Sequence, residues 1–342
     1  MSVARVVRPR CSVLLPFRNV AETIAEAVES LLGDGLDPIE VIAIDDGSTD
    51  EGPSIVRAIA LRDARVRLES TGGLGIVGAL EFARTLVHPS SEYIARMDGD
   101  DVALPGRLRA QIAWLDARPS ASLVATQVEA FPSEIVGDGL ARYVAWQNAA
   151  LSAEEHKREL FVEAPICHPS VVMRRDALEF VGGYRETRWA EDYDLWLRFD
   201  AAGCAIEKVP QCLLRWRQRE GRLTWTHARY DAERFYEAKA QYLAPKIKST
   251  RRPITVWGAG PTGRRSMRAL EAHELRASRF VDIDPRKIGR VARGVAIEPP
   301  EALSPERDCV VVAVGARGAR SLIRGRLDEW GFREGVDYWC VA

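Results

Sequence analysis

Disulfide bridges and zinc clusters are not expected, because the sequence has few cysteines and they are scattered. Six cysteines occur among 342 residues, and no two of them form a Cys-x-x-Cys pair. Several stand in apolar runs, where a free cysteine behaves as a small hydrophobic residue. This usage is typical of a reducing compartment and argues against structural zinc. We therefore expect a cytoplasmic protein.

Long apolar runs are also missing. No stretch approaches the ~20 apolar residues that a membrane-spanning helix needs. Residues 1–10 are basic, but the apolar run after them has only the length of a strand and shows no cleavage pattern. We expect neither a signal peptide nor an integral membrane segment, so that any membrane contact would be peripheral, at the inner face.

A large excess of charge of either sign is absent as well. Lys and Arg number 48 and Asp and Glu 49, for a formal net charge of −1. This balance gives no bulk attraction to nucleic acid or to an anionic membrane. The hydrophobic content of 46% and charged content of 28% are those of a globular protein. The length favours two domains, whereas nothing in the sequence predicts an oligomeric state.

Apolar runs in the first part of the chain alternate with amphipathic segments. The runs at residues 11–16, 39–44 and 93–97 are expected strands, and Asn19 is expected to cap the helix after the first of them. This alternation predicts an α/β fold with right-handed βαβ units and a mostly parallel sheet flanked by helices. The ends of the three strands should lie along one edge of that sheet.

The most distinctive stretch is Asp98-Gly99-Asp100-Asp101, directly after the third strand. Strand interiors do not tolerate clustered aspartates, so these should lie past the carboxyl end, where open α/β sheets bind ligands. A donor set made only of oxygen suits Mg²⁺ or Mn²⁺. The alternative is a solvated polar turn, since Asp and Gly are ordinary turn residues.

Two further charged segments can be interpreted in more than one way. Glu191 and Asp192 precede apolar residues at helical spacing, and acids in the first turn of a helix are favoured by its dipole alone. Residues 215–222 are rich in Arg and could meet a diphosphate or an anionic acceptor, or form a solvated basic loop. Residues 131–163 show little pattern apart from a helix expected near 154–161.

The last part of the chain has the pattern of a separate unit. Residues 244–253 are polar, basic and flanked by proline, which is typical of a linker. We therefore expect a first domain over residues 1–243 and a second over residues 254–342.

A glycine-rich turn follows the first expected strand of this second domain. Gly258, Gly260 and Gly263 form a Gly-x-Gly-x-x-Gly pattern between a strand and a helix, and Asp282 follows the next strand. These four residues are candidate nucleotide-binding residues of a small Rossmann-like domain. The alternative is that the glycines only allow a tight turn and close packing of the helix.

Several motifs of the first domain follow one another in a characteristic order. They are residues 12–19 (SVLLPFRN), 44–50 (IDDGSTD), 92–101 (EYIARMDGDD), 168–171 (HPSV), 182–184 (GGY) and 191–196 (EDYDLW). With them, the first ~230 residues resemble the family-2 glycosyltransferases of the GT-A fold. The glycine turn near residue 72 departs from the pattern. Such enzymes often have an Asn before the glycine and a further Asn in the next helix, where this chain has Ser70-Thr71-Gly72 and Glu81. The C-terminal part is similar to small nucleotide-binding-type domains attached to some sugar-modifying enzymes.

The resemblance implies transfer of a sugar, with inversion, from a nucleotide-diphosphate donor, most often a UDP-sugar, to an acceptor hydroxyl. It implies a saccharide or lipid-linked acceptor in surface polysaccharide or glycolipid assembly, and dependence on Mg²⁺ or Mn²⁺. Asp100 would be a direct metal ligand, Asp98 a metal or ribose contact, and His227 a third ligand. Asp192 would be the catalytic base, with Glu191 as the second choice.

The resemblance also assigns donor contacts. Pro16 and Arg18 would lie near the base or ribose, Asp45 would accept hydrogen bonds from the base, and Asp46 would brace the turn at Asp45. Arg96 would lie near the diphosphate or pair with a neighbouring acid.

A different class of function would place the C-terminal domain at the centre, as a nicotinamide-dependent oxidoreductase or a nucleotide-sensing module. The sequence shows no evident hydride-transfer partner such as a Tyr-x-x-x-Lys pair.

Overall fold

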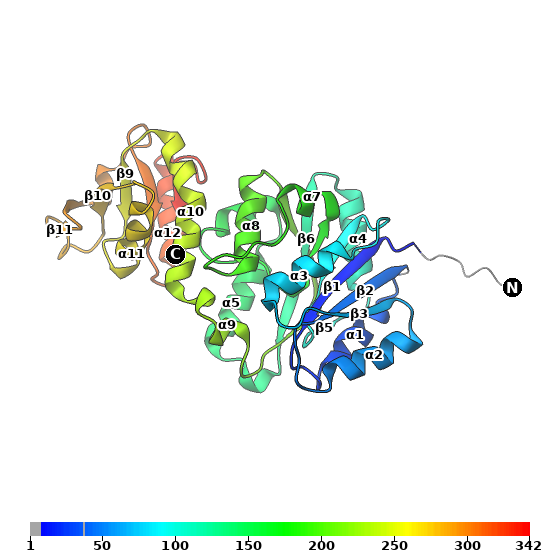
Figure 1. Ribbon diagram of the computed structural model, residues 1–342. Coiled ribbons are helices and arrows are strands. Elements are labelled where there is room, and N and C mark those ends of the chain that lie inside the picture. The colour runs from blue at the N-terminus through cyan, green and yellow to red at the C-terminus, as the bar shows by residue number, and fades with distance from the viewer. Residues whose placement is uncertain (1–7, 37) are drawn as a thin grey trace. The chain divides into compact units, whose positions relative to one another are not determined.

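The computed structural model describes residues 8–36 and 38–342 (Figure 1). Most of the basic segment that precedes the first strand, residues 1–7, lies outside them. The chain forms two compact units, each described by itself. The first comprises Met1–Ala153, Pro165–Glu186 and Ala202–Arg222, and the second Glu154–Ala164, Thr187–Ala201 and Leu223–Ala342.

The first unit contains an eight-stranded sheet in the order β3-β2-β1-β4-β7-β6-β8-β5. Its strands are β1 (Cys11–Phe17), β2 (Ile39–Asp45), β3 (Val66–Ser70), β4 (Tyr93–Arg96), β5 (Val102–Ala103), β6 (Ala121–Phe131), β7 (Val172–Arg174) and β8 (Ala205–Arg217). The first four in this order pair in parallel, β7 is antiparallel to both of its neighbours, and β8 is parallel to β6. The expected mostly parallel sheet is therefore confirmed.

Helices cover this sheet with apolar faces at helical spacing. They are α1 (Ile24–Leu32), α2 (Gly52–Arg62), α3 (Gly75–Thr85), α4 (Arg107–Ala117), α5 (Asp138–Ala149) and α7 (Arg175–Phe180), with short 3₁₀ turns η1 (Ser133–Ile135) and η2 (His168–Ser170). In α1, for example, Ile24, Val28 and Leu31 are fully buried. Strand β1 is buried along its whole length, so the core lies on both faces of the sheet centre.

Helix α1 begins later than expected, and Asn19 does not cap it. The helix starts at Ile24, whereas Asn19 adopts a left-handed conformation with φ of 52°. Its side-chain oxygen accepts a hydrogen bond of 2.8 Å from the N–H of Thr49. Asn tolerates this backbone region better than most residues, so Asn19 ties the loop after β1 to the loop after β2.

The second unit contains a six-stranded sheet in the order β11-β12-β10-β9-β13-β14. Its strands are β9 (Ile254–Trp257), β10 (Ala277–Val281), β11 (Val291–Ala292), β12 (Val295–Glu298), β13 (Cys309–Val312) and β14 (Tyr338–Cys340). All pairs except β11–β12 are parallel. The chain forms β9 first, then β10 beside it, and later β13 on the opposite side of β9. This strand arrangement is typical of a Rossmann-like sheet.

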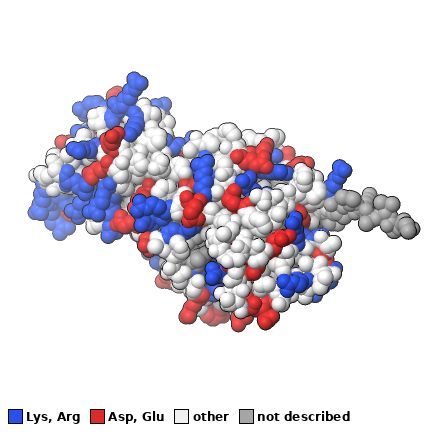
Figure 2. All heavy atoms as spheres, viewed as in Figure 1, with Lys and Arg blue, Asp and Glu red and all other residues white. Residues whose placement is uncertain are grey.

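The helices of the second unit come from three parts of the chain. They are α6 (Ala153–Glu159), α8 (Glu191–Ala201), α9 (Leu223–Thr226), α10 (Ala232–Thr250), α11 (Pro261–Glu271) and α12 (Ala319–Glu329), with 3₁₀ turns η3 (Ala228–Tyr230) and η4 (Pro300–Ala302). Lys and Arg gather over much of the C-terminal part on the face seen in Figure 2. Within the described ranges, no helix combines the length and apolar character needed to cross a bilayer.

The linker expected at residues 244–253 is wrong over most of its length. Helix α10 continues through Pro245 to Thr250, because Leu243, Ala244 and Ile247 extend its buried face. Proline removes one helical hydrogen bond, but the burial of these apolar side chains holds the helix together. The boundary at residue 243 therefore falls inside a packed helix, and the second unit also includes segments around α6 and α8.

Candidate active site

The carboxyl ends of β1, β2 and β4 lie next to one another in the first sheet, as the sequence predicts. The register pairs Phe17 with Asp45 across β1 and β2, and Leu14 with Arg96 across β1 and β4. Strand β1 runs one residue past Pro16. Pairing with β4 has ended at Leu14, so the missing N–H of Pro16 costs no hydrogen bond to that strand. Arg18, just past the strand, is exposed.

Asp45 is held in a tight turn at the end of β2. One carboxylate oxygen accepts a 2.8 Å hydrogen bond from the N–H of Ser48, and the other lies 3.4 Å from the hydroxyl of Ser70. Only about 9% of Asp45 is exposed. Its carboxylate is therefore fixed in direction while acceptor capacity remains.

Asp46 braces the glycine turn, residues 71–75, rather than the turn at Asp45. It accepts hydrogen bonds from the Thr71 hydroxyl at 2.7 Å and from the Gly75 N–H at 3.0 Å. Gly47, with φ of 78°, faces this turn so closely that a Cβ would lie 3.2 Å from the N atom of Gly73. The loops after β2 and β3 thus form one packed structure.

Asp98, Asp100 and Asp101, here called the acid cluster, lie directly after β4. Each offers a carboxylate oxygen within 4.8 Å of the others. The glycine between them is pressed against β1, since a Cβ at Gly99 would lie 2.8 Å from the Cβ of Phe17. The predicted juxtaposition of three carboxylates is therefore present, on a backbone fixed by the sheet.

Asp101 is the most buried member of the acid cluster. It is 1% exposed, and its Oδ1 accepts a 2.7 Å hydrogen bond from the N–H of Arg217. Its Oδ2 is buried and has no hydrogen-bond partner. Burial, and then the charges of Asp98 and Asp100, raise the pKa of Asp101 well above its usual value. Unused oxygen capacity in a cluster of carboxylates fits a hard divalent cation.

Arginines contact the acid cluster, so of the two interpretations of residues 215–222 the solvated basic loop does not hold for Arg217 and Arg219. Arg219 Nε lies 2.7 Å from Asp100 Oδ2, and Arg217 Nε donates to the carbonyl oxygen of Asp100 at 2.6 Å. Arg217 also pairs with Glu26. Arg96, 2% exposed, lies 2.6 Å from Asp98, which matches the expectation that it pairs with an acid. These partners could not be assigned from the sequence.

The second acid pair begins α8 in the second unit. Glu191 is 3% exposed and accepts a 2.9 Å hydrogen bond from the Tyr230 hydroxyl, with Arg229 at 3.5 Å. Asp192 is only partly buried, and its Oδ1 accepts a 2.7 Å hydrogen bond from the N–H of Tyr193. Burial and the nearby charges of Glu191 and Asp192 raise the pKa of Tyr230. The two acids therefore differ, with Glu191 enclosed and Asp192 more accessible.

His227, the candidate metal ligand, and His168, from the motif at residues 168–171, have different surroundings. His227 is exposed, and its Nδ1 accepts a 3.3 Å hydrogen bond from the N–H of Arg229. His168 is buried, with its Nε2 3.0 Å from the Tyr184 hydroxyl. Burial, and then the charge of Arg96, lower the pKa of His168 well below its usual value.

Glu81, one of the positions where the sequence departs from the family pattern, holds a turn. Its carboxylate accepts a 2.6 Å hydrogen bond from the N–H of Tyr184 and pairs with Arg84 at 2.8 Å. The sequence shows that Glu81 departs from the family pattern, but its hydrogen bond to Tyr184 could not be predicted from that departure.

The glycine motif of the second unit lies between β9 and α11, as predicted. Asp282 follows β10, accepts a 3.0 Å hydrogen bond from the N–H of Ala259, and pairs with Lys287 at 2.8 Å. Burial alone would raise the pKa of Asp282, but hydrogen bonds from Lys287 and from backbone N–H groups outweigh it and lower the pKa.

Residues 12–182, half of the chain, match the family model described as glycosyl transferase family 2. The chain therefore belongs to glycosyltransferase family 2 and is a glycosyltransferase, as the resemblance of its motifs predicted. The glycosyltransferase named EpsE of Bacillus subtilis (strain 168) is 31% identical over 215 residues, which cover 61% of this chain and 73% of EpsE.

Two further comparisons extend over more of the chain. The succinoglycan biosynthesis protein ExoU of Rhizobium meliloti (strain 1021) is 30% identical over 323 residues, covering 85% of this chain and 84% of ExoU. The crystal structure of residues 1–349 of S. aureus TarS in complex with UDP-GlcNAc has a TM-score of 0.55 and 19% identity, and the match covers 70% of this chain and 66% of that chain. This last likeness supports the predicted GT-A fold.

Proposed function

We propose that the chain transfers a sugar from a nucleoside-diphosphate donor to an acceptor hydroxyl, with inversion. The observation that carries this proposal is the acid cluster at the sheet edge where the ends of β1 and β2 also lie. UDP is the first donor nucleotide to test, since the TarS structure of similar fold was a complex with UDP-GlcNAc. The name of ExoU motivates a saccharide or lipid-linked acceptor of polysaccharide assembly, with peripheral membrane contact.

Asp98 and Asp100 would hold a Mg²⁺ or Mn²⁺ ion, with Asp101 behind them. The donor set is made of oxygen only, and the buried Oδ2 of Asp101 has no hydrogen-bond partner that a cation would have to displace. A divalent ion bound here would neutralise charge on the diphosphate leaving group. His227 stays a proposed third ligand.

Arg219 is proposed to exchange partners when the donor binds. In the structure it pairs with Asp100 at 2.7 Å and is partly exposed, so the pair can separate at modest cost. A diphosphate offers a guanidinium group stronger acceptors than a single carboxylate does. We therefore assign Arg219 to the diphosphate in the donor complex, while Arg217 keeps the backbone of Asp100 in place.

The base and ribose are assigned to the first two strand ends. Asp45 would accept hydrogen bonds from the base, because its carboxylate is aligned by Ser48 and keeps acceptor capacity. Arg18, exposed just past β1, would contact the ribose or base, next to Pro16. Asp46 would act indirectly, by holding the glycine turn.

Asp192 is proposed as the base that removes the acceptor proton. Glu191 already accepts a hydrogen bond from the hydroxyl of Tyr230 and lies near Arg229, so fewer of its acceptor positions are available to a substrate hydroxyl. Asp192 is more accessible and lies in the same first turn of α8. A carboxylate that removes this proton as the sugar is attacked on the face opposite the leaving group gives inversion in a single displacement.

The test is a screen for hydrolysis and transfer over UDP-sugars with Mn²⁺ or Mg²⁺, on the unaltered chain and on Asp192→Asn. The proposal expects release of UDP from one donor by the unaltered chain, and loss of that release in Asp192→Asn with UDP binding retained. Full activity of Asp192→Asn would overturn the assignment of the base.

A further inference from the structure

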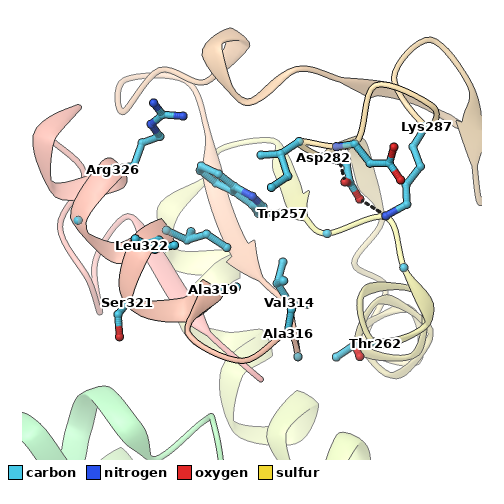
Figure 3. Close-up of a pocket in the computed structure, with 18 of the residues that line it drawn as sticks. Trp257, Thr262, Asp282, Lys287, Val314, Ala316, Ala319, Ser321, Leu322 and Arg326 are labelled. Atoms are coloured by element: carbon cyan, nitrogen blue, oxygen red, sulfur yellow. Dashed lines mark hydrogen bonds and ion pairs between the residues drawn. The ribbon is translucent and has the colours of Figure 1, made fainter.

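A cavity of about 960 Å³ lies at the carboxyl edge of the second sheet. It lies at the ends of the neighbouring strands β9 and β13, which are followed along the chain by β10 on one side of this pair and by β14 on the other. In sheets of this kind, ligands bind where the strand order reverses in this way. Figure 3 shows Trp257 in the middle of the view, with Leu322 and Arg326 of α12 on one side and the Asp282–Lys287 pair on the other. The cavity has the size of a small-molecule site, and none of the residues assigned to glycosyl transfer lines it.

Two of the three motif glycines are required by the fold itself. Gly258 has φ of 113°, and a Cβ there would lie 2.8 Å from the carbonyl oxygen of Ala313. A Cβ at Gly263 would overlap the carbonyl oxygen of Gly258. For these two positions, a tight turn and close helix packing are a sufficient explanation.

The fold does not explain the middle glycine. Gly260 has ordinary extended dihedrals, with φ of −77° and ψ of −173°. A Cβ at Gly260 would meet no atom within 4 Å. Gly260 nevertheless lines the cavity. The absence of a side chain here leaves room for a group that must approach the backbone closely, which is the use of the second glycine where a turn of this kind binds a diphosphate.

The rim of the cavity is apolar and exposed. Ile283, after β10, and Leu322, on α12, are 72% and 77% exposed, although both are large aliphatic side chains. Trp257, which also lines the cavity, is buried. Exposed aliphatic groups beside a cavity of this size suit a flat, largely apolar ring such as a nucleobase.

Three acids line the cavity, Asp282, Asp284 and Glu329, and the two that follow β10 are paired with basic side chains of the second unit. Asp282 pairs with Lys287 at 2.8 Å, and Asp284 with Arg286 at 3.1 Å. They therefore offset little of the positive end of α11, whose first turn contributes Pro261 and Thr262 to the wall. The N-terminal end of a helix of this length favours phosphate groups.

Asp282 keeps only part of its acceptor capacity. In dinucleotide sites the corresponding acid accepts a ribose hydroxyl. Here one of its oxygens accepts from Ala259 and Lys287, and the other from the N–H of Asp284 at 3.0 Å. A carboxylate has about four acceptor positions, so one is left, which is enough for a single ribose hydroxyl.

From Gly260, the exposed aliphatic side chains and the paired Asp282 and Asp284, we propose that the second unit binds a nucleoside diphosphate in this cavity. The diphosphate lies against Gly260 and the first turn of α11, and the base contacts Ile283 and Leu322. The chain then has two nucleotide sites, one in each unit. This site does not depend on the donor site or on a metal.

The test titrates ADP, UDP and NAD⁺ separately into the full chain by calorimetry, in a chelating buffer, and repeats each titration with Gly260→Val and Leu322→Glu. Both variants should bind ADP or UDP at least about tenfold more weakly. The side chain introduced by Gly260→Val fills the space proposed for the diphosphate, and Leu322→Glu replaces the apolar contact of the base with a carboxylate. Val291→Glu is the matched control: Val291 is 69% exposed in the same unit but does not line the cavity. It should bind normally, and thermal melting checks that all the variants fold.

Asp45→Asn separates this site from the proposed donor site, because it should leave the binding measured here unchanged. Binding that is lost in Asp45→Asn and retained in Gly260→Val would overturn the proposal, as would binding of none of the three compounds. NAD⁺ binding tenfold tighter than that of ADP and UDP would overturn the assignment of the ligand class.

Discussion

The two units each present the carboxyl edge of a mostly parallel sheet, and the acidic side chains at the two edges differ in how fully their oxygens are used. In the first unit three aspartates crowd together, Asp98 and Asp100 are paired with Arg96 and Arg219, and Asp101 keeps a buried oxygen without a hydrogen bond. In the second unit Asp282 is nearly saturated by Lys287 and backbone N–H groups. We therefore propose a metal and a diphosphate for the first edge, and a nucleotide without a metal for the second.

The largest expected effect concerns proton transfer. Asp192→Asn should lower kcat about 10³-fold, the middle of the range for a general base, and leave the Kd of UDP unchanged. Steady-state kinetics and calorimetry measure the two quantities. Glu191→Gln serves as the comparison, because its partners Tyr230 and Arg229 predict a loss of stability instead. If Glu191→Gln loses more activity at unchanged stability than Asp192→Asn does, the roles are reversed.

The next prediction concerns the ion pair between Arg219 and Asp100. Arg219→Gln should tighten Mn²⁺ binding in the absence of nucleotide, by up to about fivefold, because an exposed ion pair is worth up to ~1 kcal/mol. The same variant should weaken UDP binding. Spin-resonance titration of free Mn²⁺ measures the first change and calorimetry the second. Arg215→Gln, whose partner is Glu129 at 3.8 Å, is the control and should change neither. Weaker Mn²⁺ binding in Arg219→Gln would contradict the exchange of partners.

Two glycine substitutions in the first unit should change the free energy of unfolding in opposite directions. Gly47→Ala should lower the free energy of unfolding by about 1–2 kcal/mol, because its φ of 78° is unfavourable for alanine. Gly139→Ala, inside α5 with open space around it, should raise the free energy of unfolding by about 0.5–1 kcal/mol. Urea denaturation measures both, and equal signs would contradict this description of the turn.

The smallest expected effect is a pH dependence due to His168. Its pKa is lowered in the folded chain, so it stays neutral there while the unfolded chain takes up a proton. The group makes no contribution well above the unfolded pKa of ~6.5. Below that pH it destabilises the fold by up to about 1.4 kcal/mol per pH unit, until its folded pKa is reached. Unfolding between pH 7.5 and 5.5 should therefore be less pH-dependent in His168→Gln, and an unchanged slope would exclude the effect.

The features that the sequence predicts well are those set by local pattern. The acid cluster follows a short apolar run, and the Gly258 motif follows another, so both strand ends can be placed from periodicity alone. Pairings across long separations escape this reasoning. The contact of Arg219 with Asp100 depends on the register of β8 against β6, which shifts at several irregularities. No periodicity in the sequence encodes those shifts.

The predicted linker is wrong because proline and basic residues are weaker evidence here than apolar spacing. Pro245 and the basic residues around it are typical of a connection, whereas the apolar spacing of Leu243 and Ile247 decides the outcome. The second unit also includes residues 154–164 and 187–201, whose packing with residues far along the chain has no local signal.

The central claim is that the acid cluster and a divalent cation together hold a nucleoside diphosphate. The measurement that tests it most directly is calorimetric titration of UDP into Gly260→Val, with and without Mn²⁺, and with Asp100→Asn added. This background removes the site proposed in the second unit. The account predicts that Mn²⁺ tightens UDP binding at least about tenfold and that Asp100→Asn abolishes this gain. Equal UDP affinity with Mn²⁺ and with a chelator would contradict it.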